Sequence, residues 1–185
     1  MKKQGLILVC GRPGSGKSTL AKVLAQEFHA VLIDKDCVDE AFSPGDRGPF
    51  YVKEIQPKCY QTLLNIAEPN LQLRRHVILD APWTHNFLHF PELATQVEKL
   101  AAKTGSELAV LDIELPKEVI RQRLMARGFK RDEPKLTKEG WEEFVARHRM
   151  GEKNPLPHFL INGQESLEIC AKKAIEYIQT KLRED

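Results

Sequence analysis

The stretch Gly11-Arg12-Pro13-Gly14-Ser15-Gly16-Lys17-Ser18 has the residue types and the spacing of a phosphate-binding loop. Its glycines allow the backbone to curl so that successive N–H groups point at phosphate oxygens. A helix that starts here adds the positive end of its dipole. Lys17 would reach the β- and γ-phosphates, and the Ser18 hydroxyl would be a ligand for Mg²⁺. The motif predicts nucleotide binding, and a chance glycine-rich turn is the alternative.

A second candidate lies at the end of a short apolar run. His76 to Leu79 has the length and composition of a buried strand, and Asp80 follows it. A carboxylate at the end of a neighbouring strand can hold Mg²⁺ directly or through water. The alternative is an aspartate that caps the turn before Pro82. We favour Asp80 as a metal ligand, together with Ser18.

Asp34 and Asp36 stand at the end of another predicted strand, residues 30–33. Parallel sheets bind ligands at this edge, and a carboxylate here could accept the proton of an acceptor hydroxyl. One of the two could instead cap the next helix. Asp36 is the stronger candidate for the catalytic base, and Asp34 stays open as the alternative.

Arginines gather between positions 121 and 131. Arg123 and Arg127 are four residues apart on a predicted helix and share a face, whereas Arg131 lies beyond the predicted helix stop. Guanidinium groups stabilise the negative charge that spreads over phosphate oxygens during transfer. The pattern favours an arginine-bearing lid at about residues 127–139, with Arg127 and Arg131 as catalytic groups. A solvated basic face paired with nearby acids is the alternative.

Four further side chains follow Asp80 closely. His85 and His89 have the i, i+4 spacing that suits a metal on a helix face, but no third ligand accompanies them. We expect them to line the acceptor pocket or the surface. Trp83 and Phe87 could contact a substrate, and packing in the core is at least as good an interpretation.

These groups need a framework, and the apolar pattern predicts one. Short apolar runs alternate with amphipathic stretches of helix length, which is typical of an α/β fold with a parallel sheet covered on both faces. Pro57 and Pro69 should start, kink or break the second predicted helix. Residues 43–49 are predicted to be a mobile loop near a ligand. The expected strands are 5–10, 30–33, 76–79, 108–115 and 158–161, and the expected helices are 18–28, 52–73, 91–104, 116–127, 138–150 and one that Ser166 caps.

The composition is that of one ordinary globular domain. The chain has 185 residues, of which 42% are apolar and 29% charged, and this excludes disulfide scaffolds, collagen-like chains and disordered chains. Lys and Arg total 28 and Asp and Glu 26, so the net charge of +2 provides no strong field toward nucleic acid or anionic lipid. Its four cysteines form no CxxC pair, and no apolar run approaches the roughly 20 residues of a membrane span. We expect a single cytoplasmic domain over residues 1–185, a monomer or homodimer, with neither nucleic acid nor membrane as partner.

Together these segments resemble the small adenylate-kinase-like P-loop kinases. The resemblance is to the branch with zeta toxins, polynucleotide 5′-kinases, chloramphenicol phosphotransferase and many AAA-type ATP-binding proteins. It extends from about Leu6 to Ile161 and rests on four segments: Gly11 to Thr19, Leu32 to Asp36, Val77 to Pro82, and Arg121 to Asp132. It implies a three-layer P-loop NTPase fold with a five-stranded parallel sheet, MgATP as donor, and a hydroxyl as acceptor.

The resemblance also implies roles for individual residues. The loop from Gly11 to Thr19 would bind the nucleotide, and the lid arginines of the family match Arg127 and Arg131. The arginine that stacks on adenine matches Arg123, with Arg121 as the alternative.

On the acceptor side, the family's aspartate matches Asp36. In polynucleotide kinases a basic residue follows that aspartate by three positions, whereas here the position is Asp39. This departure argues against a nucleic-acid 5′-hydroxyl as acceptor. The sequence therefore predicts an ATP-dependent phosphotransferase that acts on a hydroxyl of a small molecule. A nucleoside, nucleotide or polynucleotide kinase and a regulatory nucleotide-binding module are the alternatives.

Overall fold

A five-stranded parallel sheet forms the centre of the structure, a computed structural model that describes residues 3–42, 48–128 and 130–183. Its strand order is β2-β3-β1-β4-β5, and each neighbouring pair runs parallel. The strands are β1 (Gly5–Gly11), β2 (Val31–Asp34), β3 (Val77–Asp80), β4 (Glu107–Glu114) and β5 (Phe159–Asn162). The predicted parallel α/β architecture is confirmed.

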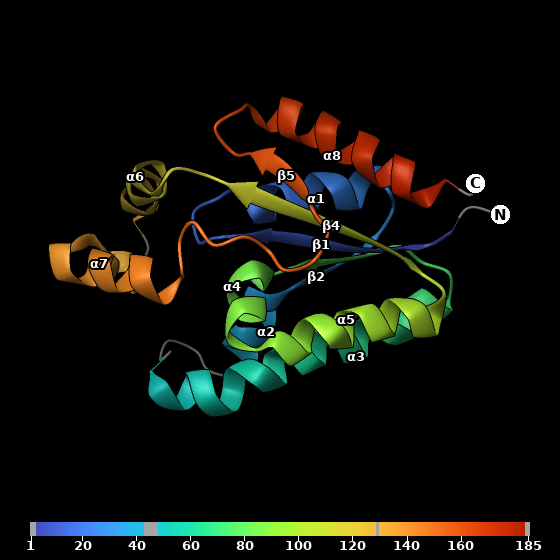
Figure 1. Cartoon of the computed structure of the whole chain (residues 1–185), viewed down its shortest axis with the longest axis horizontal. Helices are drawn as coiled ribbons and strands as arrows, with labels where there is room; N and C mark the ends of the chain where they lie inside the picture. Colours follow the sequence, from blue (N-terminus) through green and yellow to red (C-terminus); the bar gives the residue numbers. More distant parts are fainter. Residues whose placement is uncertain (1–2, 43–47, 129, 184–185) are drawn as a thin grey trace.

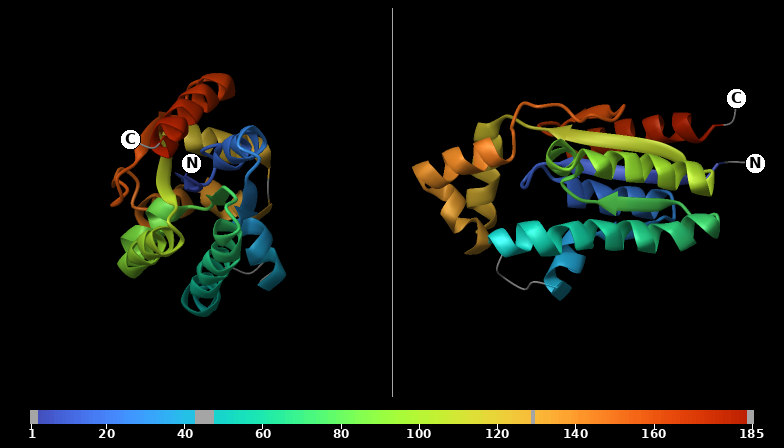
Figure 2. Two further views of the ribbon diagram at one scale, coloured as in Figure 1. Left: turned by 90° about the vertical axis from the view of Figure 1, so that its right-hand side faces the viewer. Right: turned by 60° about the horizontal axis from the view of Figure 1, so that its bottom comes forward.

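Helices cover both faces of the sheet (Figure 1). α1 (Lys17–Glu27) and α8 (Leu167–Leu182) lie on one face, and α3 (Gln56–Gln72) and α5 (Pro91–Thr104) lie on the other. α2 (Lys35–Phe42), η1 (Tyr51–Ile55) and α4 (Trp83–His89) stand on the same side as α3. The remaining elements, α6 (Lys117–Arg127), η2 (Lys130–Leu136) and α7 (Lys138–Arg147), gather beyond the carboxyl ends of the strands (Figure 2). The two chain termini lie at the opposite end of the sheet (Figure 2).

The central strand explains why the sheet needs two helical layers. Every residue of β1 is buried, so neither face of the strand can meet water. Successive side chains alternate between the faces: Leu6 and Leu8 join the core beneath α3 and α5, and Ile7 and Val9 join the core beneath α1 and α8.

Local sequence signals set several helix ends. Thr137 and Ser166 are N-caps whose hydroxyls accept the backbone N–H three residues further on, as is usual for these residue types. Gly105 and Gly128 end α5 and α6 in the left-handed conformation that glycine adopts without strain. Short-range signals therefore set one end each of α5, α6, α7 and α8.

Two helices were not predicted, and one predicted break is absent. Lys35–Phe42 and Trp83–His89 form short helices directly after β2 and β3. Pro57 lies in the first turn of α3, as predicted, but α3 continues through Pro69. The carbonyl of Asn65 loses its helical donor there, and because Asn65 is exposed, water can replace that donor. The predicted loop at 43–49 falls mostly outside the described residues. Across the described parts of the chain, no helix has both the length and the apolar character needed to traverse a bilayer.

Trp83 provides a test of the core. Its ring is fully buried and packs edge-on against Tyr60 with ring centroids 4.9 Å apart, and its Nε1–H donates to the carbonyl of Leu79 at 3.1 Å. The packing interpretation of Trp83 and Phe87 is confirmed, since both are buried. We expect Trp83→Ala to lower the free energy of unfolding by about 3–5 kcal/mol in urea denaturation, because it leaves a large cavity.

Trp141→Ala is the matched control. Trp141 is half-buried at the edge of the molecule, where the Arg121 guanidinium lies 5.6 Å from its ring centroid. Its removal should lower the free energy of unfolding by less than about 2 kcal/mol. A smaller loss for Trp83→Ala than for Trp141→Ala would contradict this description of the core.

Candidate functional site

The loop after β1 has the curled backbone that a phosphate cradle requires. Gly14 and Gly16 take φ angles of 83° and 93°, which side chains with a Cβ rarely adopt. Between them, the N–H of Ser15 donates to the carbonyl of Arg12 at 3.0 Å and closes a tight turn. The glycine positions of the motif are therefore required by the backbone conformation.

The N-terminus of α1 faces the interior of this loop. The helix begins at Lys17, and no side chain caps it. Within the described residues, the backbone N–H groups of Gly16, Lys17 and Ser18 donate to no protein acceptor. Free N–H groups at a helix N-terminus, next to a lysine, form a binding site for an anionic group.

Helix α6 holds the loop from the outside. Arg123 donates from Nη1 to the carbonyl of Ser15 at 3.3 Å and from Nη2 to the carbonyl of Gly163 at 2.9 Å. Arg121 instead points away from the loop, since its Nη2 donates to the carbonyl of Leu136 at 3.0 Å. Of the two arginines considered for the adenine, Arg123 is the one beside the loop.

Asp80 and Ser18 fit a magnesium site. Asp80 is paired in register with Val9 of β1 and is 2% exposed. Its carboxylate lies within the electrostatic reach of the Ser18 hydroxyl, and its Oδ1 has no hydrogen-bond partner in the described chain. An orphaned carboxylate oxygen beside a serine hydroxyl is a hard oxygen donor set of the kind Mg²⁺ prefers, with water and phosphate oxygens as its other ligands.

Burial also alters the acidity of this carboxyl group. Desolvation raises the pKa of Asp80 to about 6, against the opposing effects of Lys17 and the Ser18 hydroxyl. Asp34 and Asp36 add to the rise in pKa, so both carboxylates lie within electrostatic reach of Asp80. A cation bound here would relieve the cost of the buried negative charge.

Asp34 and Asp36, at the end of β2, have different structural roles. Asp34 Oδ1 accepts the backbone N–H of Asp36 at 2.8 Å, which makes Asp34 the cap of α2. Asp34 also pairs in register with Asp80. Both aspartates are partly exposed, and because Asp34 already caps α2, Asp36 in the first turn of that helix stays the candidate for meeting a second substrate.

Sequence reasoning missed a buried charge pair beside Asp36. Lys35 Nζ donates to both carboxylate oxygens of Asp39 at 2.8 and 2.6 Å and lies 2.8 Å from the Tyr51 hydroxyl. Tyr51 in turn donates to Asp39 at 2.7 Å. Asp39 is wholly buried in this network, which joins α2 to η1. The acid at the position that is basic in polynucleotide kinases is thus part of an internal ion pair.

The predicted lid residues lie next to α7. Arg127 Nε donates to Asp132 at 2.5 Å, and Lys135 Nζ donates to the same carboxylate at 2.6 Å. Burial raises the pKa of Asp132, but these two hydrogen bonds outweigh burial and hold it below its usual value. Arg131 lies in η2, and its side chain is outside the described part of the structure. η2 and α7 pack on α6 around a small core of their own, formed by Ile120, Leu124 and Phe144 with their neighbours.

Comparisons with known proteins agree with this geometry. The parallel sheet and the glycine-rich loop are those of a P-loop NTPase fold. A family model described as an AAA domain matches residues 6–150, and the chain belongs to that AAA domain family.

Individual relatives are more distant. An uncharacterised protein of Mycobacterium tuberculosis is 32% identical over 133 residues, which are 66% of this chain and only 26% of that protein. The chain thus spans about a quarter of the length of this relative. Two solved structures share the fold: a Chloroflexus aurantiacus protein inferred to be a kinase (TM-score 0.72, 18% identity, 98% of this chain and 99% of that one) and a gluconokinase from Sinorhizobium meliloti (TM-score 0.63, 15% identity, 98% and 95%).

The raised pKa of Asp80 leads to a prediction for Asp80→Asn. At pH 8 the wild-type carboxylate is ionised in a buried site that favours its protonated form, so the stability of the wild type falls as pH rises from about 4, the ordinary pKa, to about 6, the raised one. The neutral asparagine removes this penalty. We expect the metal-free variant to melt a few degrees higher than the wild type at pH 8, with the difference shrinking as pH falls below about 6 and vanishing below about pH 4.

Magnesium and nucleotide should reverse the order of the two melting temperatures. With Mg²⁺ and a non-hydrolysable ATP analogue, the wild type should gain more thermal stability than Asp80→Asn, and this gain should decline as pH falls through about 6. Equal stabilisation of both proteins would remove Asp80 from the metal site. Glu27→Gln, an exposed change at the end of α1, controls for a general loss of charge.

Proposed function

We propose that this protein transfers the γ-phosphate of ATP to a hydroxyl group of a small molecule. Three features at one edge of the sheet carry the proposal. They are the backbone N–H groups of Gly16 to Ser18 that donate to no protein acceptor among the described residues, the buried carboxylate of Asp80, and the partly exposed Asp36. A phosphate donor, a cation and a hydroxyl acceptor require these groups in this neighbourhood. The gluconokinase fold supports a polyhydroxylated acceptor.

The donor side would act mainly by positioning. The N–H groups of Gly16 to Ser18 and the Lys17 ammonium would hold the phosphate oxygens in place. Ser18 and Asp80 would hold Mg²⁺, which when bound neutralises charge on the β- and γ-phosphates. Arg123 would keep the loop curled through its bond to Ser15.

On the acceptor side, Asp36 would accept a hydrogen bond from the substrate hydroxyl and take its proton as the oxygen attacks the γ-phosphorus, while the bond from that phosphorus to the β,γ-bridging oxygen breaks and ADP leaves. Asp34 would fix the first turn of α2, and hence the place of Asp36, through its bond to the Asp36 N–H. Arg127, released from Asp132, and Arg131 would approach the transferring group and balance its charge.

Lys17→Ala tests the donor side. The variant loses the ammonium that would contact the phosphates, so we expect ATP-dependent transfer to fall by at least about a hundredfold. Lys22→Ala, an exposed lysine on the same helix, is the matched control and should retain wild-type activity. Transfer is followed with γ-labelled ATP across sugars, sugar acids, polyols, nucleosides and oligonucleotides. Undiminished transfer by Lys17→Ala would refute the role of the loop.

Asp36→Asn tests the acceptor side. The amide cannot take a proton, so kcat should fall by about 10²–10⁴ while the affinity for the ATP analogue stays within about twofold. Glu40→Gln, exposed on the same helix, should leave both unchanged. Full activity of Asp36→Asn would assign the base elsewhere. If no compound stimulates ATP turnover although ATP binds, the regulatory module is the better description.

A further inference from the structure

Three buried nitrogen atoms on the acceptor side of the phosphate loop have no hydrogen-bond partner among the described residues. They are Nη1 of Arg12, Nδ1 of His85 and Nδ1 of His148. Buried polar atoms in folded proteins are nearly always paired, so three orphans need an explanation. They come from different elements: Arg12 from the loop after β1, His85 from α4, and His148 from the end of α7.

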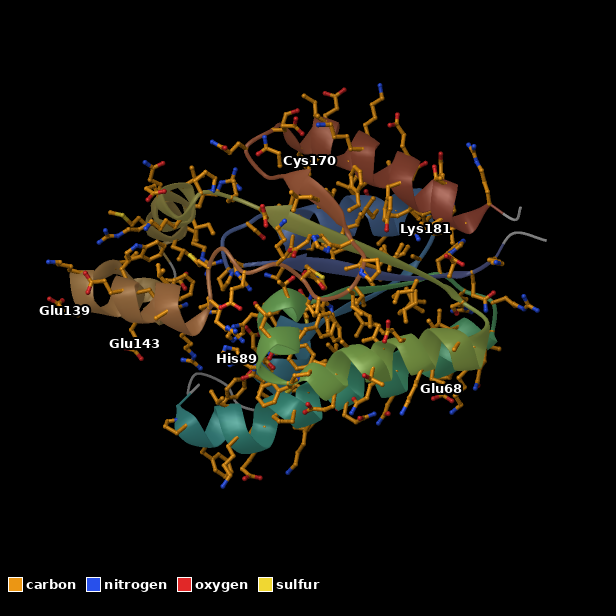
Figure 3. The ribbon with its side chains drawn as sticks, in the orientation of Figure 1. Glu68, His89, Glu139, Glu143, Cys170 and Lys181 are labelled. Carbon is orange, nitrogen blue, oxygen red and sulfur yellow. The ribbon has the colours of Figure 1, made fainter. Side chains whose placement is uncertain are left out.

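These atoms belong to one cluster. The rings of His85 and His148 lie 4.4 Å apart between centroids, and the ring of His89 lies 4.6 Å from that of His85. Arg12 is tied to the same place, because its Nη2 donates to the carbonyl of Arg149 at 3.1 Å, directly after His148. Figure 3 shows His89 on the side of α4 that is turned toward α7.

The surroundings of the two rings are cationic. The charges of Arg12 and Arg147 lower the pKa of both imidazoles. Lys35 also lowers the pKa of His85, and Lys135 that of His148. Burial is the largest cause, and with these cations it lowers the pKa of His85 to about 3 and that of His148 to about 2. Both rings are therefore neutral at pH 7 in this state.

Three acidic side chains near the cluster affect the pKa of Arg12. Asp112, Glu114 and Glu152 oppose the effect of burial on the pKa of Arg12, yet none of them accepts a hydrogen bond from its orphaned Nη1. Asp112 is occupied otherwise, since Thr84 donates to it at 2.7 Å.

The chemistry of the cluster selects the charge of its ligand. A metal cation would be repelled by the two arginines, and the described residues hold no group of three or more metal-ligating side chains. An anion would accept hydrogen bonds from a guanidinium and from ring N–H groups of two imidazoles, and it would favour protonation of both rings.

We infer that Arg12, His85 and His148 bind a carboxylate or phosphate group carried by the phosphate acceptor. The inference rests on the proposed function only in assigning this anion to the acceptor. It specifies the substrate class: a small molecule with a hydroxyl group to be phosphorylated and an acidic group that anchors it. Because the rings of His85 and His148 lie 4.4 Å apart, the anion would bind where the end of α7 meets α4.

Imidazole NMR resonances of the protein test the site directly. The protein is first saturated with Mg²⁺ and a non-hydrolysable ATP analogue, so that the phosphate loop is filled, and is then titrated with inorganic phosphate or, separately, with acetate. We expect saturable shifts of the His85 and His148 resonances and a rise in the pKa of both rings. The exposed His29, at the other end of α1, should not respond. A stronger effect of phosphate than of acetate would indicate a phosphorylated acceptor, and the reverse a carboxylic acid.

The variant His85→Phe tests whether phosphate binds at this cluster and not elsewhere on the protein. His85→Phe keeps an aromatic ring in the stack but removes the nitrogen atoms, so phosphate should bind at least about tenfold more weakly, as judged at His148. His29→Phe is the matched control. The inference is overturned if neither anion shifts His85 and His148 in the nucleotide-loaded protein, or if the shifts occur only when the loop is empty. Failure of the proposed function would appear separately, as no binding of the ATP analogue.

Discussion

The curl of the backbone between Gly11 and Ser18 is the constraint on which the rest of the site depends. It needs positive φ angles at Gly14 and Gly16, and it leaves the first N–H groups of α1 unpaired. The curl is held from two sides, by its own turn and by Arg123 of α6. Because β1 is central and wholly buried, the loop cannot shift without disturbing both layers of the core.

Around this loop, the candidate site draws on two parts of the structure. Ser18 lies in the first turn of α1, after the loop that follows β1, and Asp80 ends β3, the neighbour of β1. Arg127 and His148 belong instead to α6 and α7, whose small separate core adjoins the carboxyl ends of the strands. Arg127 is paired with Asp132, and His148 packs against His85 of α4. Under the proposed function, the donor would bind at the sheet edge and the acceptor would be anchored where α7 meets α4.

Local signals made much of this predictable. The glycine spacing before Lys17, the apolar strands of a parallel sheet and the cap at Ser166 each depend on a few neighbouring residues, and the structure confirms them. Contacts between distant segments were not predictable in the same way. The burial of Asp39 depends on its bonds to Lys35 and to Tyr51 of η1. The short helices α2 and α4 are stabilised by packing on neighbouring elements more than by their own sequence. The contact between His85 and His148 likewise exists only because the fold brings α7 to α4.

Backbone amide hydrogen exchange at the phosphate loop tests the central claim most directly. Exchange is compared with and without Mg²⁺ and a non-hydrolysable ATP analogue, under conditions in which binding of the analogue is verified independently. The account predicts marked slowing at Gly16 to Ser18, since their N–H groups would then donate to phosphate oxygens. Unchanged exchange at these amides in the nucleotide-bound protein would contradict it.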